Sequence, residues 1–337
     1  MNMRFTTLLV ASLTFLSFAS FADEASKNLR KVADHLQDIS VTIKAESPNG
    51  YGSSEGSGTM IVREVNGEKI TFVWTAGHVI DHLRSVRTVI NESGQPVKVV
   101  EFADPTIVKE LVEKGRRVGE MKMDARVIKF SDADDGEDLA VLMVRARDYA
   151  KSGAEFRLEK TDDNIVPIGT QLFHVGSLLG QMGANSMTTG IISQVGRTLG
   201  KVEYDQTTVT AFPGSSGGGV YLTDGRYVGM LVRGAGEGFN LIVPVRRMER
   251  WAKKHNIMWA LDSKVKMPSF DEIDELPVEA AGLPTKSKKT KSVKEKAALK
   301  DMPFLIKVIP AEGSSDLETE LDKRPTGQTI SPKLELR

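Results

Sequence analysis

The run Pro213-Gly214-Ser215-Ser216-Gly217-Gly218 places two serines among glycines, where few side chains are available to pack a core. A serine hydroxyl in such a loop can attack a carbonyl carbon, and nearby backbone amides can bind the oxyanion that forms. Glycine favours this arrangement because it lets the backbone approach a ligand closely. The same pattern is also typical of a plain Gly/Ser turn between strands, so the chemistry requires a base and an acid elsewhere in the chain.

A candidate general base is His78, within the stretch Thr75-Ala76-Gly77-His78-Val79 that directly follows an apolar strand predicted for residues 70–74. A histidine at the end of a buried strand is held rigidly, which suits a base whose neutral imidazole must point at a nucleophile. A structural histidine with satisfied hydrogen bonds would fit the same position. A suitably placed acid elsewhere in the chain would favour the general base over the structural histidine.

A candidate acid is Asp138, which stands directly before the apolar strand predicted for residues 139–144. Of the carboxylates in the acidic loop 131–138, it is the one expected to be buried and fixed, as an acid that orients a histidine must be. A calcium site in this loop is not predicted, because Gly136 in the sixth position of an EF-hand would put Ser131 and Ala133 at ligand positions. We expect no metal and no cofactor.

The composition is that of a globular chain of 337 residues that can bury a substantial core. Its 45 basic and 45 acidic residues balance, so no general attraction to nucleic acid or to an anionic membrane is expected. The chain contains no cysteine, which excludes disulfides, thiolate metal sites and a cysteine nucleophile.

The N-terminal residues 1–22 are typical of a secretory signal peptide. Arg4 precedes an apolar stretch at residues 5–21, and Ser20 and Ala22 are small residues suited to the −3 and −1 positions of a cleavage site. The alternative is an uncleaved membrane anchor, for which the stretch is short and rich in hydroxyls. We therefore predict a periplasmic or secreted protein without stable membrane insertion after signal cleavage.

Two blocks of short strands divided by glycine-rich turns predict an all-β fold with two antiparallel six-stranded barrels. The first block spans about residues 39–150 and the second about residues 165–245. A short helix is expected before them at residues 23–38, and a closing helix after them at residues 246–256.

Several stretches together resemble the trypsin-like (chymotrypsin-fold) serine proteases, and within them the protease domain of the HtrA/Deg type. The resemblance covers about residues 39–256, and we take residues 39–262 as the protease domain. The order His, Asp, Ser separates this family from subtilisin-like and α/β-hydrolase enzymes. The matching stretches are Gly56-Ser57-Gly58-Thr59-Met60-Ile61, Thr75 to Val79, Asp138-Leu139-Ala140-Val141-Leu142, Val175-Gly176, Thr188 to Ser193, Pro213 to Gly218 and Gly238 to Pro244.

This resemblance implies a role for each matching residue. Ser216 attacks the scissile carbonyl, and His78 takes its proton and later protonates the leaving amine. Asp138 holds the imidazole tautomer and stabilises the imidazolium. The N–H groups of Gly214 and Ser216 form the oxyanion hole, and Ser215 shapes the loop. The implied activity is that of an exported serine endopeptidase acting on proteins or peptides through an acyl-enzyme; the alternative is a catalytically silent homologue that binds peptides or proteins.

The same resemblance places a specificity pocket with no buried carboxylate for Lys or Arg, so we expect cleavage after small or medium apolar residues. Arg233 could favour acidic residues near the scissile bond or could point to solvent. The implied base of the pocket is Thr210, and its implied walls are Val232, Arg233, Gly234, Phe239 and Asn240.

Two regions depart from the HtrA pattern. Asp104 as N-cap and Pro105 as the first helical residue predict a short helical insertion that ends at Gly115. No PDZ-like domain is expected after the protease domain; the charge blocks of residues 263–337 instead predict a mostly disordered tail, acidic at residues 271–279. The sequence does not predict the oligomeric state.

Overall fold

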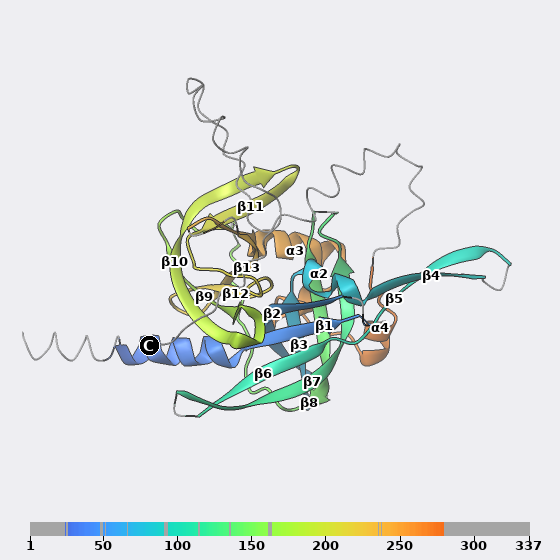
Figure 1. Ribbon diagram of the computed structural model, residues 1–337, viewed down its shortest axis with the longest axis horizontal. Helices are drawn as coiled ribbons and strands as arrows, with labels where there is room; N and C mark the ends of the chain where they lie inside the picture. The colour runs from blue at the N-terminus through green and yellow to red at the C-terminus, as the bar shows by residue number, and fades with distance from the viewer. Residues whose placement is uncertain are drawn as a thin grey trace, which may run out of the picture.

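Two closed antiparallel β-barrels form most of the structure, which is a computed structural model (Figure 1). It describes residues 24–279 apart from 25, 48–49, 51, 66, 91–93, 114, 135, 161–163, 235 and 237. The predicted all-β class and its pair of six-stranded barrels are confirmed. The signal peptide predicted at residues 1–22 lies outside the described residues. Within them, no helix is long and apolar enough to cross a membrane.

The first barrel closes in the strand order β1-β2-β3-β8-β7-β6. Its strands β3 and β8 pair with each other and carry nearly continuous buried apolar runs, at residues 70–74 and 139–144. Because His78 follows the first run and Asp138 precedes the second, this pairing brings the two residues to one end of the barrel. The strands are β1 (Ser40–Glu46), β2 (Ser53–Val65), β3 (Glu68–Thr75), β6 (Thr106–Glu113), β7 (Arg116–Ser131) and β8 (Leu139–Arg147).

The second barrel closes in the order β10-β11-β14-β13-β12-β9 around a smaller apolar interior that includes Leu172, Ile192 and Ile242. The serine loop leads directly into its strand β12, which pairs with β9 and β13. The strands are β9 (Gln171–Leu178), β10 (Gly183–Leu199), β11 (Val202–Thr207), β12 (Gly219–Leu222), β13 (Tyr227–Gly234) and β14 (Asn240–Pro244).

One helix precedes the two barrels in the sequence, and another follows them. Residues 26–38 are helical, and Gln37 of this helix donates a side-chain hydrogen bond to the carbonyl of Asn185 at 3.0 Å. Helix α3 (Val245–Lys254) follows the last strand of the second barrel. Its Trp251 packs edge-on against Trp74 of β3, with ring centroids 5.6 Å apart. Helix α3 therefore joins the two barrels on the side where β3 ends.

The helical insertion predicted for residues 104–115 is wrong, because β6 occupies this segment. β6 pairs with both β1 and β7 and thereby closes the first barrel. Its Ile107 and Val108 are buried apolar side chains of the β-branched type that strands favour. The barrel closure therefore overrides the local helix-start signal of Asp104 and Pro105. A separate two-stranded sheet, β4 (Arg84–Ile90) and β5 (Pro96–Phe102), extends away from the barrels (Figure 1).

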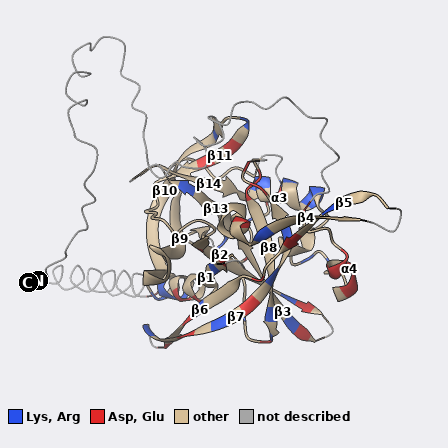
Figure 2. Ribbon diagram, turned by 45° about the vertical axis from the view of Figure 1, so that its right-hand side comes forward, with Lys and Arg blue, Asp and Glu red and all other residues tan. Residues whose placement is uncertain are grey.

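The prediction of a disordered tail is wrong for residues 263–279. This segment contains α4 (Phe270–Asp274), which begins with a capping box formed by Ser269 and Glu272. Figure 2 shows the acidic α4 beside the first barrel, where Asp274 pairs with Arg126. The backbone N–H of Phe130 donates to the carbonyl of Val278 at 2.8 Å. The rest of the predicted tail lies outside the described residues.

Candidate active site

His78 and Asp138 form a close pair at the end of the first barrel. His78 lies in the short helix α2 (Gly77–Ile80), which begins directly after β3. Its Nδ1 lies 3.0 Å from Oδ1 and 2.9 Å from Oδ2 of Asp138, and its backbone N–H donates to Oδ1 at 3.0 Å. The imidazole keeps 39% of its surface exposed, whereas the carboxylate keeps 1%. The geometry thus fixes Nδ1 against a buried acid and leaves part of the ring open to a substrate.

The two side chains shift each other's pKa in opposite directions. Burial disfavours the imidazolium, but the charge of Asp138 and its hydrogen bonds to the ring outweigh this and raise the pKa of His78. Burial of Asp138 would raise its own pKa, but the charge of His78 and hydrogen bonds from its side chain and backbone hold that pKa below its usual range. Asp138 is therefore ionised whenever His78 acts as a base, as an orienting acid requires.

The serine loop is shaped by glycines with left-handed backbone angles. Gly214 has φ +93°, and a Cβ there would lie 2.4 Å from the carbonyl oxygen of Ser177. Gly217 has φ +88°, and a Cβ there would lie 2.1 Å from the carbonyl oxygen of Ser57. Because of the positive φ and the close carbonyl oxygen, a side chain at either position would force the backbone to shift. These two glycines set the turn that presents Ser216.

Two backbone amides of this loop are free to bind an anion. The carbonyl of Pro213 accepts from the N–H of Leu179 at 2.7 Å, and the carbonyl of Ser215 accepts from the N–H of Gly218 at 3.0 Å. In a trans peptide the N–H points opposite to the carbonyl, so the amides of Gly214 and Ser216 point away from these contacts. Neither amide has a hydrogen-bond partner among the described residues.

The hydroxyl of Ser216 is not hydrogen-bonded to His78 in the described part of the chain. Its Oγ lies 3.5 Å from the carbonyl oxygen of Val232, at the outer limit of a hydrogen bond. Ser215, by contrast, is buried, and its Oγ accepts from the N–H of Phe212 at 3.1 Å. This difference supports the sequence-based interpretation that Ser215 shapes the loop and leaves Ser216 as the available hydroxyl.

A second histidine beside the loop has no acid partner among the described residues. His174 is fully buried, and its Nδ1 lies 3.0 Å from the carbonyl oxygen of Gly219. Burial lowers the pKa of His174 to about 4, so the ring stays neutral near pH 7. The contrast with His78 shows that the nearby carboxylate, and not proximity to the serine loop, makes a histidine basic here.

The six residues predicted to form a specificity pocket come from different parts of the second barrel. Gly234 of β13 pairs directly with Asn240 of β14. Asn240 is buried and donates from Nδ2 to the carbonyl of Val209 at 2.6 Å. The ring of Phe239 lies 5.2 Å below the guanidinium of Arg197. Val232 contributes its carbonyl beside Ser216, whereas Thr210 is exposed.

Arg233 of β13 lies near enough to the His78–Asp138 pair for its charge to act on both residues. It is half-buried, and its Nε is buried without a hydrogen-bond partner among the described residues. Its positive charge contributes to lowering the pKa of both His78 and Asp138. A positive charge therefore acts on both the candidate base and the acid beside it.

Sequence reasoning missed the role of Ser57, which connects the barrels beneath the serine loop. Its Oγ donates to the carbonyl of Gly214 at 2.7 Å and accepts from the N–H of Ser177 at 2.7 Å. Its own N–H donates to the carbonyl of Ser216 at 2.7 Å. The glycines that flank Ser57 in the sequence were the available signal, since they mark a close backbone approach.

The chain belongs to the trypsin-like peptidase family: the model of the trypsin-like peptidase domain matches residues 56–230, which contain His78, Asp138 and the whole serine loop. The serine protease Do-like HtrA of Lactococcus lactis subsp. cremoris (strain MG1363) is 33% identical over 121 residues. That alignment covers 33% of this chain and 28% of the relative, so this chain matches less than a third of that protein's length.

Two solved proteases are also similar to this chain. An HtrA-type protease with tripeptide has a TM-score of 0.47 and 16% identity, covering 68% of this chain and 63% of its own. The serine endoprotease from Yersinia pestis has a TM-score of 0.46 and 17% identity, covering 67% of this chain and 65% of its own. The family assignment rests on the match at residues 56–230.

Proposed function

We propose that this chain is an exported serine endopeptidase that cleaves proteins or peptides with His78, Asp138 and Ser216. The observation that carries the proposal is the contact of His78 Nδ1 with both oxygens of the buried Asp138 carboxylate. A carboxylate in this position holds the tautomer whose Nε2 can accept a proton. Membership of the trypsin-like peptidase family supports the same activity.

In the proposed reaction, Ser216 Oγ attacks the scissile carbonyl carbon while His78 Nε2 accepts its proton. The tetrahedral oxyanion is bound by the N–H groups of Gly214 and Ser216, which have no partner among the described residues. His78 then donates the proton to the leaving amine, which departs and leaves an acyl-enzyme on Ser216. Water attacks the acyl group with His78 again as base, and the acid product leaves as Ser216 regains its proton.

The pocket residues support a preference for small or medium apolar side chains before the scissile bond. In the proposed pocket, Gly234 leaves room beside Asn240, and Val232, Phe239 and Thr210 add no charge. Among the six proposed pocket residues, Arg233 supplies the only positive charge. This charge would face the substrate side chains on either side of the scissile bond.

A second candidate function is that of a catalytically silent homologue that binds peptides or proteins. The position of Ser216 Oγ beside the Val232 carbonyl, instead of within reach of His78, is the observation that favours it. Rotation about one side-chain bond is fast and moves the hydroxyl between staggered positions. Catalytic hydrogen bonds are often long or misaligned before substrate binds, so we retain the peptidase as the main proposal.

Casein hydrolysis by three proteins tests this choice. The parent chain is expected to cleave casein, Ser216→Ala to lose cleavage, and Ser215→Ala to retain it, since Ser215 is buried and bonded to the Phe212 amide. Cleavage by Ser216→Ala at the parent rate would remove Ser216 as the nucleophile. A silent parent that still binds casein fragments would support the binding module instead.

A further inference from the structure

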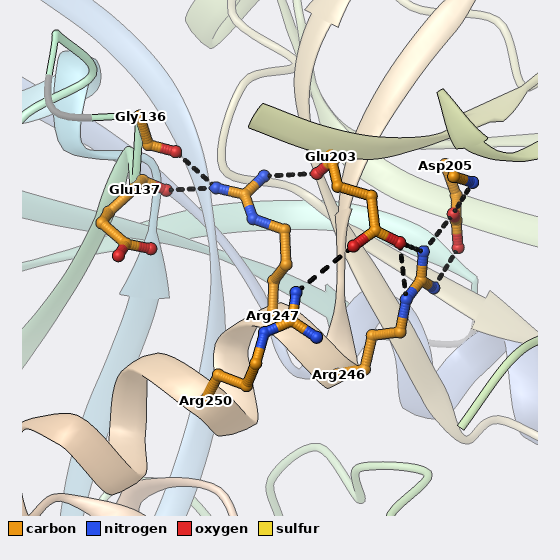
Figure 3. A network of polar contacts seen from close by, with 8 residues as sticks. Gly136, Glu137, Glu203, Asp205, Arg246, Arg247 and Arg250 are labelled. Carbon is orange, nitrogen blue, oxygen red and sulfur yellow. Dashed lines mark hydrogen bonds and ion pairs between the residues drawn. The ribbon is translucent and has the colours of Figure 1, made fainter. Parts of the chain in front are cut away.

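Arg247 connects the second barrel to the loop that carries Asp138. It lies in the first turn of α3, is 5% exposed, and stacks over the ring of Tyr204 at 4.9 Å. Its Nη1 donates to the carbonyl of Glu203 at 2.9 Å, while Nη2 donates to the carbonyls of Gly136 at 2.5 Å and Glu137 at 3.3 Å (Figure 3). One guanidinium thus binds main-chain atoms of both barrels.

The neighbouring Arg246 differs in what it binds. It pairs with the carboxylates of Glu203 and Asp205 within its own barrel, at 2.5 and 2.6 Å (Figure 3). Arg247 instead donates to three main-chain carbonyls, although a buried cation is costly without a hydrogen-bonded carboxylate. Burial accordingly lowers the pKa of Arg247. Stabilisation of the fold by a salt bridge therefore accounts for Arg246 but does not account for Arg247.

The two loop carbonyls that Arg247 binds immediately precede Asp138. Asp138 has φ +52°, a left-handed backbone conformation that is uncommon for residues other than glycine. At the start of the same loop, Nε1 of Trp251 donates to Oγ of Ser131 at 2.7 Å. Helix α3 therefore holds the loop at both ends, and Arg247 holds the end next to the strained acid.

We propose that Arg247 is a positioning residue for the reaction: it fixes the Gly136 and Glu137 carbonyls so that Asp138 stays against His78. The proposal rests on the proposed peptidase function. Without the guanidinium, the backbone at Asp138 is free to relax from its left-handed conformation, and the carboxylate moves relative to Nδ1. The imidazole then loses both its orientation and part of the charge that favours its protonation.

The test compares Arg247→Met with Arg246→Met, which removes the neighbouring guanidinium but no contact with the loop. We expect Arg247→Met to lower kcat by about 10- to 100-fold with little change in KM, because a small misplacement of a catalytic group has effects of this size. The acid limb of its pH profile should move to lower pH. Arg246→Met should lose stability but keep the parent kcat and pH midpoint. Equal values for both variants, changed or unchanged, would overturn the proposal.

A second pair of variants, with lysine at each position, tests the proposal if the methionine variants fail to fold. Arg247→Lys and Arg246→Lys both keep the charge and lose the planar fork. Arg247→Lys should show an intermediate kcat and a lowered pH midpoint, whereas Arg246→Lys should match the parent in both. A parent-like midpoint in Arg247→Lys together with an unfolded Arg247→Met would overturn the positioning role.

A measurement without turnover separates this inference from the peptidase proposal. The titration of His78 can be followed by NMR in the Ser216→Ala background, with and without Arg247→Lys. A lower His78 pKa in the double variant supports positioning even if the parent chain proves inactive, in which case only the peptidase proposal fails. An unchanged His78 pKa contradicts the positioning role even if the parent chain is active.

Discussion

The two halves of the candidate site are built in different ways. In the first barrel, His78 and Asp138 are held by side-chain contacts of 2.9 to 3.0 Å between groups whose charges favour each other. In the second barrel, Ser216 is presented mainly by the backbone: its neighbours Gly214 and Gly217 have positive φ, and among the described residues its hydroxyl has only the 3.5 Å contact to the Val232 carbonyl.

The difference follows from what each half must do. The mutual attraction of an acid and a base offsets the cost of burying them, so their barrel can enclose them. In the proposed reaction, the nucleophile and the oxyanion donors must leave room for a substrate carbonyl, which suits a loop of amides and glycines. The two halves are then joined through Ser57 beneath the serine loop and through Arg247 behind Asp138.

The largest effect on kcat is expected when Asp138, the acid of the first half, is replaced. Asp138→Asn keeps the size of the side chain but removes its charge and favours the wrong imidazole tautomer, so kcat should fall by about 10⁴-fold. Steady-state kinetics on a peptide ester and a peptide amide measure it. Asp134→Asn, in the exposed part of the same loop, is the control and should retain parent kinetics. A fall of less than tenfold in Asp138→Asn would mean that the pair does not orient the base.

The next largest effect on kcat is expected when the backbone of the serine loop, in the second half, is shifted by a substitution at Gly214. Gly214→Ala places a Cβ against the Ser177 carbonyl and must shift the amide that would bind the oxyanion. Losing one such donor costs about 10²–10³-fold in kcat.

The matched control for Gly214→Ala is Gly225→Ala in the β12–β13 turn. Gly225 has the same kind of backbone, φ +91°, but a Cβ there meets only Val32 at an ordinary 3.5 Å. It should lose stability by about 1–2 kcal/mol and keep the parent kcat. Equal losses of kcat in Gly214→Ala and Gly225→Ala would show that the loss in Gly214→Ala comes from lowered stability and not from a shifted oxyanion donor.

The pH dependence of activity sharpens the comparison because it reports only on His78 and Asp138, the half of the site in the first barrel. The pKa of His78 is raised by Asp138, and the proton acceptor is the neutral ring. Activity should therefore rise with pH through a midpoint above about 6.5, the ordinary histidine value. A profile of kcat/KM between pH 5 and 9 measures it. A midpoint below the ordinary value would contradict the contact between His78 and the ionised Asp138.

The smallest effect is expected at Arg233, a residue of the second barrel whose charge acts on His78 and Asp138 in the first. Replacing it with Ala should reduce cleavage of peptides with an acidic residue near the scissile bond by about three- to tenfold, since a partly exposed charge pair contributes modestly. Arg233→Lys should retain most of the preference. Competition between acidic and neutral peptides in one assay measures the ratio. An unchanged ratio in Arg233→Ala would place the guanidinium outside the substrate site.

The two barrels could be predicted from the sequence because short apolar strands separated by glycines are a local pattern. His78 and Asp138 could be named as candidates because each adjoins such a strand, but the pairing of those strands was not predicted. The helix expected after Asp104 failed for a nonlocal reason, since β6 is required to pair with β1 and β7. The capping box of Ser269 and Glu272 was a readable signal that the acidic composition of its segment concealed.

The contacts that join the halves could not be predicted from the sequence. Arg247 is separated from Gly136 by 111 positions along the chain, and Ser57 is 157 positions from Gly214. Each contact depends on how two closed barrels pack, which no local pattern reports. One of two adjacent arginines forms ion pairs and the other binds carbonyls, and the sequence offers no means of telling them apart.

Labelling by a fluorophosphonate probe tests the central claim most directly, because the probe reacts with a serine only when its base and oxyanion donors act together. Peptide mapping of the labelled protein should find the probe on Ser216 in the parent, none in Ser216→Ala, and strongly slowed labelling in Asp138→Asn. Absence of label from the folded parent, under conditions that label trypsin, would contradict the account.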